Sequence, residues 1–234
     1  MNKILRFLLL PVLLFSCLTM LHAQQGVAYD FSAVAPSGQM LYYKITSGNN
    51  VQVTHPNSSD NYRAWYGYAE PAGALVVPEE VAYDCRTYHV TSIRVYAFRG
   101  CSSLTSIEIP SGVTSIGNGA FYGCRSLTSI EIPSGVTYIG NVAFYGCRSM
   151  TSIGLPSGVT YIGQYAFHGC SSLTSIELPS GVTSIGEYAF YGCSSLTSIE
   201  IPSGVTAIKK GAFRGCSSLT SIELPSGVTS IGGS

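Results

Sequence analysis

Charged residues are scarce in this chain of 234 residues, because Asp, Glu, Lys and Arg together make up 10% of it, well below the usual share of about a quarter. The chain has no net charge, and two of its twelve basic residues, Lys3 and Arg6, belong to an N-terminal leader. Nucleic-acid binding depends on clustered Lys and Arg that neutralise phosphate groups. The composition therefore argues against a nucleic-acid partner.

Residues that commonly build catalytic and metal sites are also scarce. Beyond the leader the chain has only three histidines, His55, His89 and His168. No GxSxG motif or Cys-His pair places a nucleophile beside a base, and no two cysteines have the spacing of two to four residues that is typical of a zinc site. We therefore expect no enzymatic activity, no metal and no cofactor.

The N-terminus is the one long apolar stretch. A basic start precedes the apolar residues 7–21, and the small residue Ala23 follows them, a layout that is typical of a secretory signal peptide covering residues 1–23. Leu14-Phe15-Ser16-Cys17 resembles a lipobox, so a lipoprotein anchored at Cys17 is the alternative route. No other segment is apolar enough to cross a bilayer. We expect a secreted or cell-surface protein without a transmembrane segment after cleavage.

Most of the remaining chain is one motif repeated. Six cysteines recur at one constant interval, and fixed apolar positions recur between them. Self-similarity at a fixed period of this size is the signature of a solenoid, in which each unit is stabilised by its neighbours. The cysteines are Cys101, Cys124, Cys147, Cys170, Cys193 and Cys216.

Each unit predicts one circuit of a coil. In the first unit, residues 107–109 alternate apolar and polar, which indicates a strand that ends at Pro110. Residues 113–116 form a second short extended segment, and residues 118–123 suit one helical or 3₁₀ turn that Gly123 closes. Stacked circuits place identical residues in columns, with Leu, Ile, Phe and Cys inside and Ser, Thr, Glu and Tyr outside.

The pattern LxxIxIPxxVxxIGxxAFxxC resembles the leucine-rich repeat of the BspA-like family of surface proteins. The resemblance covers residues 75–234 and recurs at least five times. It implies a repeat solenoid of stacked parallel β coils, and it implies a cell-surface adhesin. Its partners would be host extracellular-matrix or plasma proteins, such as fibronectin or fibrinogen, or other microbial cells.

The regions outside the regular repeats predict the remaining organisation. Residues 24–73 form a small β-rich N-terminal cap with a hairpin of residues 40–45 and 50–54, and residues 74–100 form a degenerate first repeat with a protruding hairpin around Asp84 and Cys85. Residues 101–234 hold five complete repeats and a truncated sixth. A solenoid end normally needs a cap. Because no cap follows the last repeat in this sequence, we expect either that the chain is truncated or that a partner covers the last coil, and a second copy of the chain is one such partner.

The repeated cysteines predict buried thiols and no disulfides. Stacked side chains point in one direction, whereas a disulfide needs Cβ vectors that converge, and a buried cysteine behaves as a small hydrophobe. Cys85 differs, since its place at a hairpin tip predicts an exposed thiol.

Two outward columns are the candidate binding surfaces. The glutamate column is a ligand or cation track, or simply a solvated face that keeps the sheet from pairing with other chains. The aromatic residues after each phenylalanine, with two further tyrosines on an adjacent face, recognise a partner or only shield the coil. The members are Glu108, Glu131, Glu177, Glu200 and Glu223, and Tyr122, Tyr145, His168 and Tyr191 with Tyr138 and Tyr161.

The sequence therefore favours a non-enzymatic secreted or cell-surface binding protein, an adhesin that uses repeated surfaces. The alternative is a structural spacer or scaffold of the cell envelope without its own ligand. The fold does not by itself decide between them.

Overall fold

The computed structural model describes residues 29–57 and 64–233, and the predicted leader with Cys17 lies outside them. Within the described ranges the chain forms strands and turns, and no helix. The strands are β1 (Phe31–Val34), β2 (Met40–Ser47), β3 (Asn50–Thr54), β4 (Gly73–Val76), β5 (Glu80–Tyr83), β6 (Arg86–Ile93), β7 (Leu104–Glu108), β8 (Ser115–Ile116), β9 (Ser129–Ile130), β10 (Tyr138–Ile139), β11 (Tyr161–Ile162), β12 (Ser184–Ile185), β13 (Ala207–Ile208) and β14 (Ser230–Ile231).

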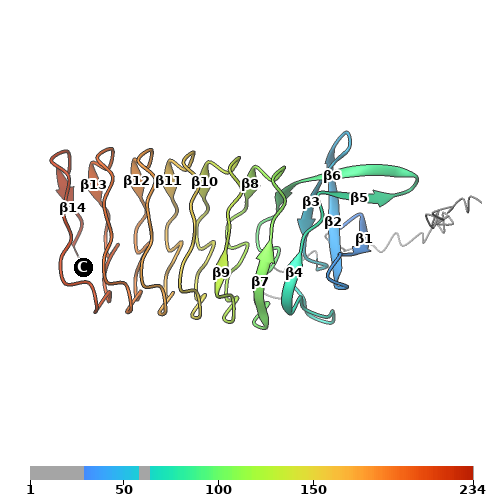
Figure 1. Cartoon of the computed structure of the whole chain (residues 1–234), viewed down its shortest axis with the longest axis horizontal. Coiled ribbons are helices and arrows are strands. Elements are labelled where there is room, and N and C mark those ends of the chain that lie inside the picture. The colour runs from blue at the N-terminus through green and yellow to red at the C-terminus, as the bar shows by residue number, and fades with distance from the viewer. Residues whose placement is uncertain (1–28, 58–63, 234) are drawn as a thin grey trace, which may run out of the picture.

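The repeats stack as coils along the longest axis of the molecule, which confirms the predicted repeat solenoid (Figure 1). Strands β10 to β14 form one parallel sheet in which each strand pairs with its copy in the next coil. Ile139 pairs with Ile162 and Ile162 with Ile185, so the register advances by one whole repeat at each step. The first extended segment of the repeat forms paired strands only at β4, β7 and β9. In later coils the same segment contributes isolated β-bridges.

The expected helical turn at residues 118–123 is absent, and consecutive tight turns replace it. The amides of Ala120, Tyr122 and Cys124 donate to carbonyls three residues earlier in their own coil. The intervening amides instead donate to the next coil, as in the bond from Phe121 to the carbonyl of Ala143. A positive φ of 61° at Gly119 interrupts helical geometry and aims alternate amides outward along the axis.

The core consists of columns of identical side chains, as the repeat predicts. Six phenylalanines, from Phe98 to Phe213, stack with ring centroids 5.3–5.5 Å apart and nearly parallel planes. Leucine and isoleucine columns are buried beside them. Burial of this apolar surface is the main favourable term in folding. Each coil therefore gains its core only by contact with the coils on both sides.

The six repeated cysteines are buried and form no disulfide, which confirms the prediction. Each of the last five also donates its thiol hydrogen to the carbonyl of a phenylalanine in the coil before, a contact that the sequence did not indicate. Cys147 Sγ, for example, lies 3.2 Å from the carbonyl oxygen of Phe121. Burial raises the pKa of these thiols, to about 11 at Cys216, so they remain protonated donors at neutral pH.

The N-terminal segment continues the solenoid. Strands β2 and β3 form the expected hairpin, and β3 pairs in parallel with β6, so that it covers the first coil (Figure 1). Strands β5 and β6 form the predicted protruding hairpin. Asp84 and Cys85 form its turn with φ values of 49° and 57°, the left-handed pair that suits the twist of a two-residue hairpin.

A glycine after the second strand permits close contact between coils. A Cβ built on Gly163 would lie 2.5 Å from the carbonyl carbon of Gly140. In one coil Lys209 replaces this glycine. The strand before it, β13, is paired with β12 through one residue pair only, whereas β11 and β12 are paired through two. The backbone of one coil therefore leaves little room for a side chain on the next.

We expect Gly163→Ala to lower the free energy of unfolding by about 2 kcal/mol, because the added methyl forces two coils apart. Urea denaturation followed by circular dichroism measures the change. Gly154→Ala is the matched control, since a Cβ there meets nothing within 4 Å and should change stability by less than about 0.5 kcal/mol. Equal effects of the two substitutions would contradict the close-contact explanation.

We also expect the native chain to react with a thiol reagent at Cys85, which is exposed, and not at the six buried repeat cysteines. Because the thiolate is the reactive species, burial protects the repeat thiols by hindering access and by raising their pKa. Mass mapping after brief labelling identifies the modified residue, and a Cys85→Ser variant is the control. Rapid labelling of any repeat cysteine in the folded protein would contradict the burial.

Candidate functional site

The five predicted glutamates occupy one outward column on the first extended segment of the repeat. Glu108 ends strand β7 and Glu131 bridges to Gly154 in the next coil. All five are exposed, and none of them forms an ion pair within the described ranges. Gly154 interrupts the column between Glu131 and Glu177, and on either side of it the like charges recur at the spacing of neighbouring strands, about 4.8 Å, so they repel one another weakly across water.

The aromatic residues that follow each phenylalanine form a continuous stack. Tyr122 and Tyr145 lie with centroids 4.6 Å apart, Tyr145 and His168 4.4 Å apart, and His168 and Tyr191 4.7 Å apart. The interplanar angles are 2°, 8° and 11°. The structure thus brings four of the predicted site residues together, and they are called the aromatic row below.

An arginine closes each end of the aromatic row. The guanidinium carbon of Arg99 lies 4.3 Å from the ring centroid of Tyr122, and that of Arg214 lies 5.9 Å from the ring of Tyr191. Both are cation–π contacts. The ring faces are therefore turned toward neighbours within the protein, and the row offers ring edges and polar atoms to solvent. Burial raises the pKa of Tyr145, so its hydroxyl stays a hydrogen-bond donor at neutral pH.

A second group of tyrosines, which the sequence analysis missed, flanks the row. Tyr165 and Tyr188 stack on each other with centroids 5.0 Å apart, and Tyr165 also contacts His168. Both have left-handed φ values of 54–55°. The same repeat position holds Tyr96, Gly119, Val142 and Gly211 in the other coils, so glycine and valine interrupt the column in the sequence.

Tyr138 and Tyr161 lie apart from the aromatic row. They face each other across β10 and β11, and Tyr138 is 38% exposed. The hydroxyl of Tyr138 contacts Ser115 Oγ at 3.3 Å. The predicted tyrosines therefore form two separate surfaces, one on the parallel sheet and one on the turn segment.

Polar side chains also link one coil to the next on the outside of the solenoid. Asn118 Oδ1 accepts a hydrogen bond from the amide of Asn141, whose own Oδ1 accepts one from Gln164, each at 2.9 Å. The hydroxyl of Thr151 contacts the carbonyl of Thr128 at 3.4 Å, and later threonines repeat the contact. These residues hold the coils together, so they are poor candidates for ligand contacts.

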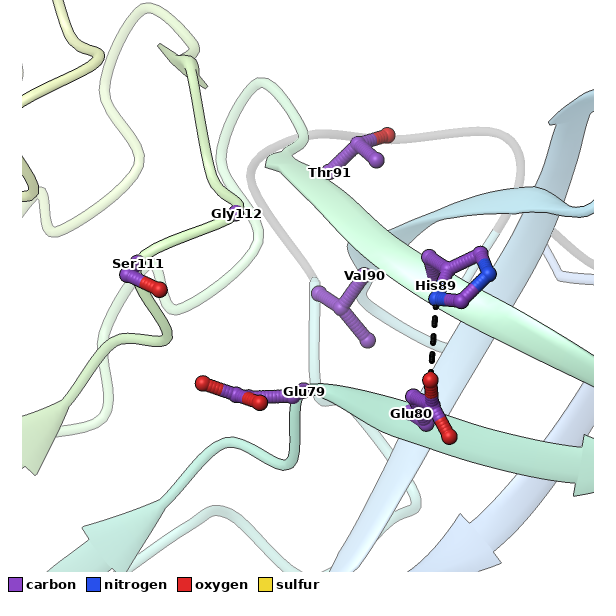
Figure 2. A pocket seen from close by; sticks show the side chains of 7 residues that line it. All are labelled: Glu79, Glu80, His89, Val90, Thr91, Ser111 and Gly112. Carbon is purple, nitrogen blue, oxygen red and sulfur yellow. Dashed lines mark ion pairs between the residues drawn. The ribbon is translucent and has the colours of Figure 1, made fainter.

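A hollow lies where the protruding hairpin meets the second coil (Figure 2). Nδ1 of His89 lies 3.2 Å from Oε1 of Glu80, and both side chains are 56% exposed. The two residues are also directly opposite in the hairpin register, so the contact is a cross-strand pair. The second ring nitrogen of His89 lies on the side away from Ser111 (Figure 2). The hollow thus does not place the serine hydroxyl beside a histidine base.

Two other kinds of site are absent from the part of the chain that the structure describes. No group of three or more His, Cys, Asp or Glu side chains there could hold a metal ion. The same residues include no helix with the length and apolar character that a membrane span requires.

The fold and these surfaces define a class of protein, a β-coil repeat solenoid that displays its outward side chains in columns. The profile of the BspA type leucine-rich repeat region matches residues 87–157 and 137–234, with six copies. This covers more than half of the chain, so the protein belongs to the BspA-type leucine-rich repeat family. Members of this family are typically non-catalytic proteins of the cell surface, which is consistent with a binding role.

Solved structures support the assignment. A leucine-rich repeat protein from Bacteroides ovatus ATCC 8483 is 36% identical, with a TM-score of 0.76, over 87% of this chain and 49% of that one. The chain thus spans about half the length of that protein. The leucine-rich repeat protein of T. pallidum is 33% identical, with a TM-score of 0.70, over 82% of this chain and 83% of that one. No curated protein matches the chain.

We expect His168 to make the folded state less stable at acid pH. Partial burial lowers the pKa of His168 below its ordinary value of 6.5, because removal from water disfavours the charged imidazolium. The unfolded chain then binds more protons than the folded chain, so stability is lost as the pH falls from 6.5 toward the folded-state pKa.

Thermal unfolding of the native chain is compared with that of the variant His168→Tyr, which keeps an aromatic ring in the row. The measurements run from about pH 7 to about pH 5, a range that brackets the ordinary pKa of histidine. The native chain should lose stability relative to this variant as the pH falls. His89→Gln is the control and should keep the loss. A difference between the native chain and His168→Tyr that does not change with pH would contradict the expectation.

Proposed function

We propose that this protein is a non-enzymatic binding protein of the cell surface or the secreted fraction, and that it acts as an adhesin. Its partners are host extracellular-matrix or plasma proteins or other microbial cells. Family membership supports the surface location and the binding role. The aromatic row is the surface that makes the contact.

The orientation of the row is the observation that carries the proposal. Stacking turns the ring faces of Tyr122, Tyr145 and Tyr191 toward their neighbours at steps of 4.4–4.7 Å, and these side chains are partly exposed, so their ring edges and hydroxyls are the groups that a partner would meet. Tyrosine and arginine are enriched among the residues that dominate binding energy at interfaces. A rigid line of such groups, already ordered by the core beneath it, loses little conformational entropy when a partner binds.

Repetition of the row suits adhesion. One hydroxyl or guanidinium contributes little by itself, but several contacts on one rigid body act together and raise the apparent affinity. The row therefore needs no deep pocket in order to hold a macromolecule.

The spacer function is the second candidate, and one observation favours it. Neighbours within the protein cover the ring faces of the row, and Arg99 and Arg214 cover its two ends. A stack of this kind stabilises the solenoid without any ligand, by about 0.5–1.5 kcal/mol per aromatic pair. In that case the columns serve only the length and rigidity of the molecule.

The triple variant Tyr122→Phe, Tyr145→Phe and Tyr191→Phe separates the two functions. Phenylalanine keeps the stacked rings and removes the outward hydroxyls, so we expect thermal stability to stay close to that of the native chain while binding falls at least about tenfold, which corresponds to about 1.4 kcal/mol. Surface plasmon resonance against immobilised fibronectin and fibrinogen, with a bacterial-cell adhesion assay, measures the binding.

The matched control is Tyr138→Phe with Tyr161→Phe, which makes the same chemical change on the sheet surface. Binding that survives the control and is lost in the triple variant supports the row as the site. Loss of binding in the control alone would move the site to β10 and β11. Absence of binding to every member of the panel would favour the spacer.

A further inference from the structure

The charges of the repeats are segregated around the coil. Five glutamates lie in the outward column of the first extended segment, here called the acidic column. The basic residues lie in the turn segment that carries the aromatic row or directly before or after it in the chain. The column is Glu108, Glu131, Glu177, Glu200 and Glu223, and the basic residues are Arg99, Arg125, Arg148, Lys209, Lys210 and Arg214, with Glu187 as the one acidic exception among residues 99–233.

The acidic column carries a charge that the protein does not neutralise. None of its five carboxylates forms an ion pair with a described residue, and like charges at this spacing destabilise the stack that holds them. Arg125 and Arg148 follow one another in adjacent coils and are exposed. A partner that places positive charge against the acidic column, or negative charge against Arg125 and Arg148, would reduce the repulsion between like charges.

The acidic column and the aromatic row also repeat with nearly the same spacing along the solenoid axis. The rings of the aromatic row are 4.4–4.7 Å apart, and the column follows the strand spacing of about 4.8 Å. Both periods arise from the same stacking of coils. A partner that engages every coil must have this period too, and a second copy of the chain has it by construction.

We propose that two copies of this chain associate side by side, with the acidic column of one copy against the aromatic row and its arginines on the other. The carboxylates accept hydrogen bonds from tyrosine hydroxyls and from guanidinium groups, the stronger charge-assisted kind. The proposal rests on the binding role of the row proposed above, and it names a copy of the same chain as the partner.

The contact is heterologous when one copy uses only its column and the other only its row, which lie on different segments of the coil. Glu108 ends strand β7, whereas Tyr122 lies in the turn segment that follows the second extended segment of the same coil. Each associated copy thus keeps an unused column on one side and an unused row on the other. Heterologous contacts that do not close into a ring can add further copies without limit. The expected product is therefore a lateral array of molecules, which would join copies on one cell surface or on two facing cell surfaces.

Charge reversal tests the contact on both sides. One variant carries Glu131→Lys, Glu177→Lys and Glu200→Lys in the column, and the other carries Arg125→Glu, Arg148→Glu and Arg214→Glu beside the row. Analytical ultracentrifugation of the full chain, at concentrations up to about 1 mM so that weak association is populated, measures the mass. We expect oligomers of the native chain, monomers of each variant alone, and oligomers again in an equimolar mixture of the two.

Salt should dissociate the native oligomers, since the screening length falls from about 10 Å at 0.1 M to about 3 Å at 1 M ionic strength. The control is Arg86→Glu on the protruding hairpin, which should associate as the native chain does. Circular dichroism establishes that each variant is folded.

A native chain that is monomeric throughout would overturn the proposal. A mixture that stays monomeric would also overturn it, even if the native chain associates. Dissociation by Leu224→Lys with Ile231→Lys, rather than by charge reversal, would instead assign the contact to the last coil, where Ile231 is 66% exposed. Because the assay contains no matrix protein or cell, its failure is distinct from failure of the adhesion panel.

Discussion

Every other feature of this protein depends on the hydrogen bonds and contacts that one coil makes with the next. A single repeat unit has too little apolar surface to form a core alone, and its alternate backbone amides point out of the coil. The next coil supplies the missing carbonyls, as Ala143 does for Phe121. The glycine after the second strand keeps this approach close, because the two backbones meet where a side chain would otherwise stand.

The same constraint shapes the surface. Since successive coils are held in one register, any residue type that recurs outside becomes a straight column, whether or not it has a partner. The phenylalanine stack inside and the aromatic row outside are two results of one geometry. This geometry also turns the ring faces of the row toward one another, and it separates the acidic column from the arginines. A surface with these properties favours recognition by hydrogen bonds and charge over recognition by flat aromatic platforms.

Much of the fold could be predicted from the sequence, because the period and the apolar positions act locally. The repeated cysteines and phenylalanines were expected inside, and they are. The expected helical or 3₁₀ turn over residues 118–123 is not observed as a helix, because this repeat position takes a positive φ in each coil, at Val142 as at Gly119, and directs alternate amides to the next coil. Tyr165 and Tyr188 were missed, since glycine and valine interrupt the tyrosines at their repeat position, whereas Tyr138 and Tyr161 were expected on a face adjacent to the row and lie on the parallel sheet.

The sequence by itself determined the length of the coil and which residues face its core, because hydrophobic burial needs only the spacing of apolar side chains along the chain. The tertiary structure alone decided which outward residues touch and how they are turned. Tyr145 and His168 are one whole repeat apart in the sequence, yet their ring centroids lie 4.4 Å apart. That nearness exists only after each coil closes and stacks, since backbone bonds between coils fix the distance and angle at which side chains meet.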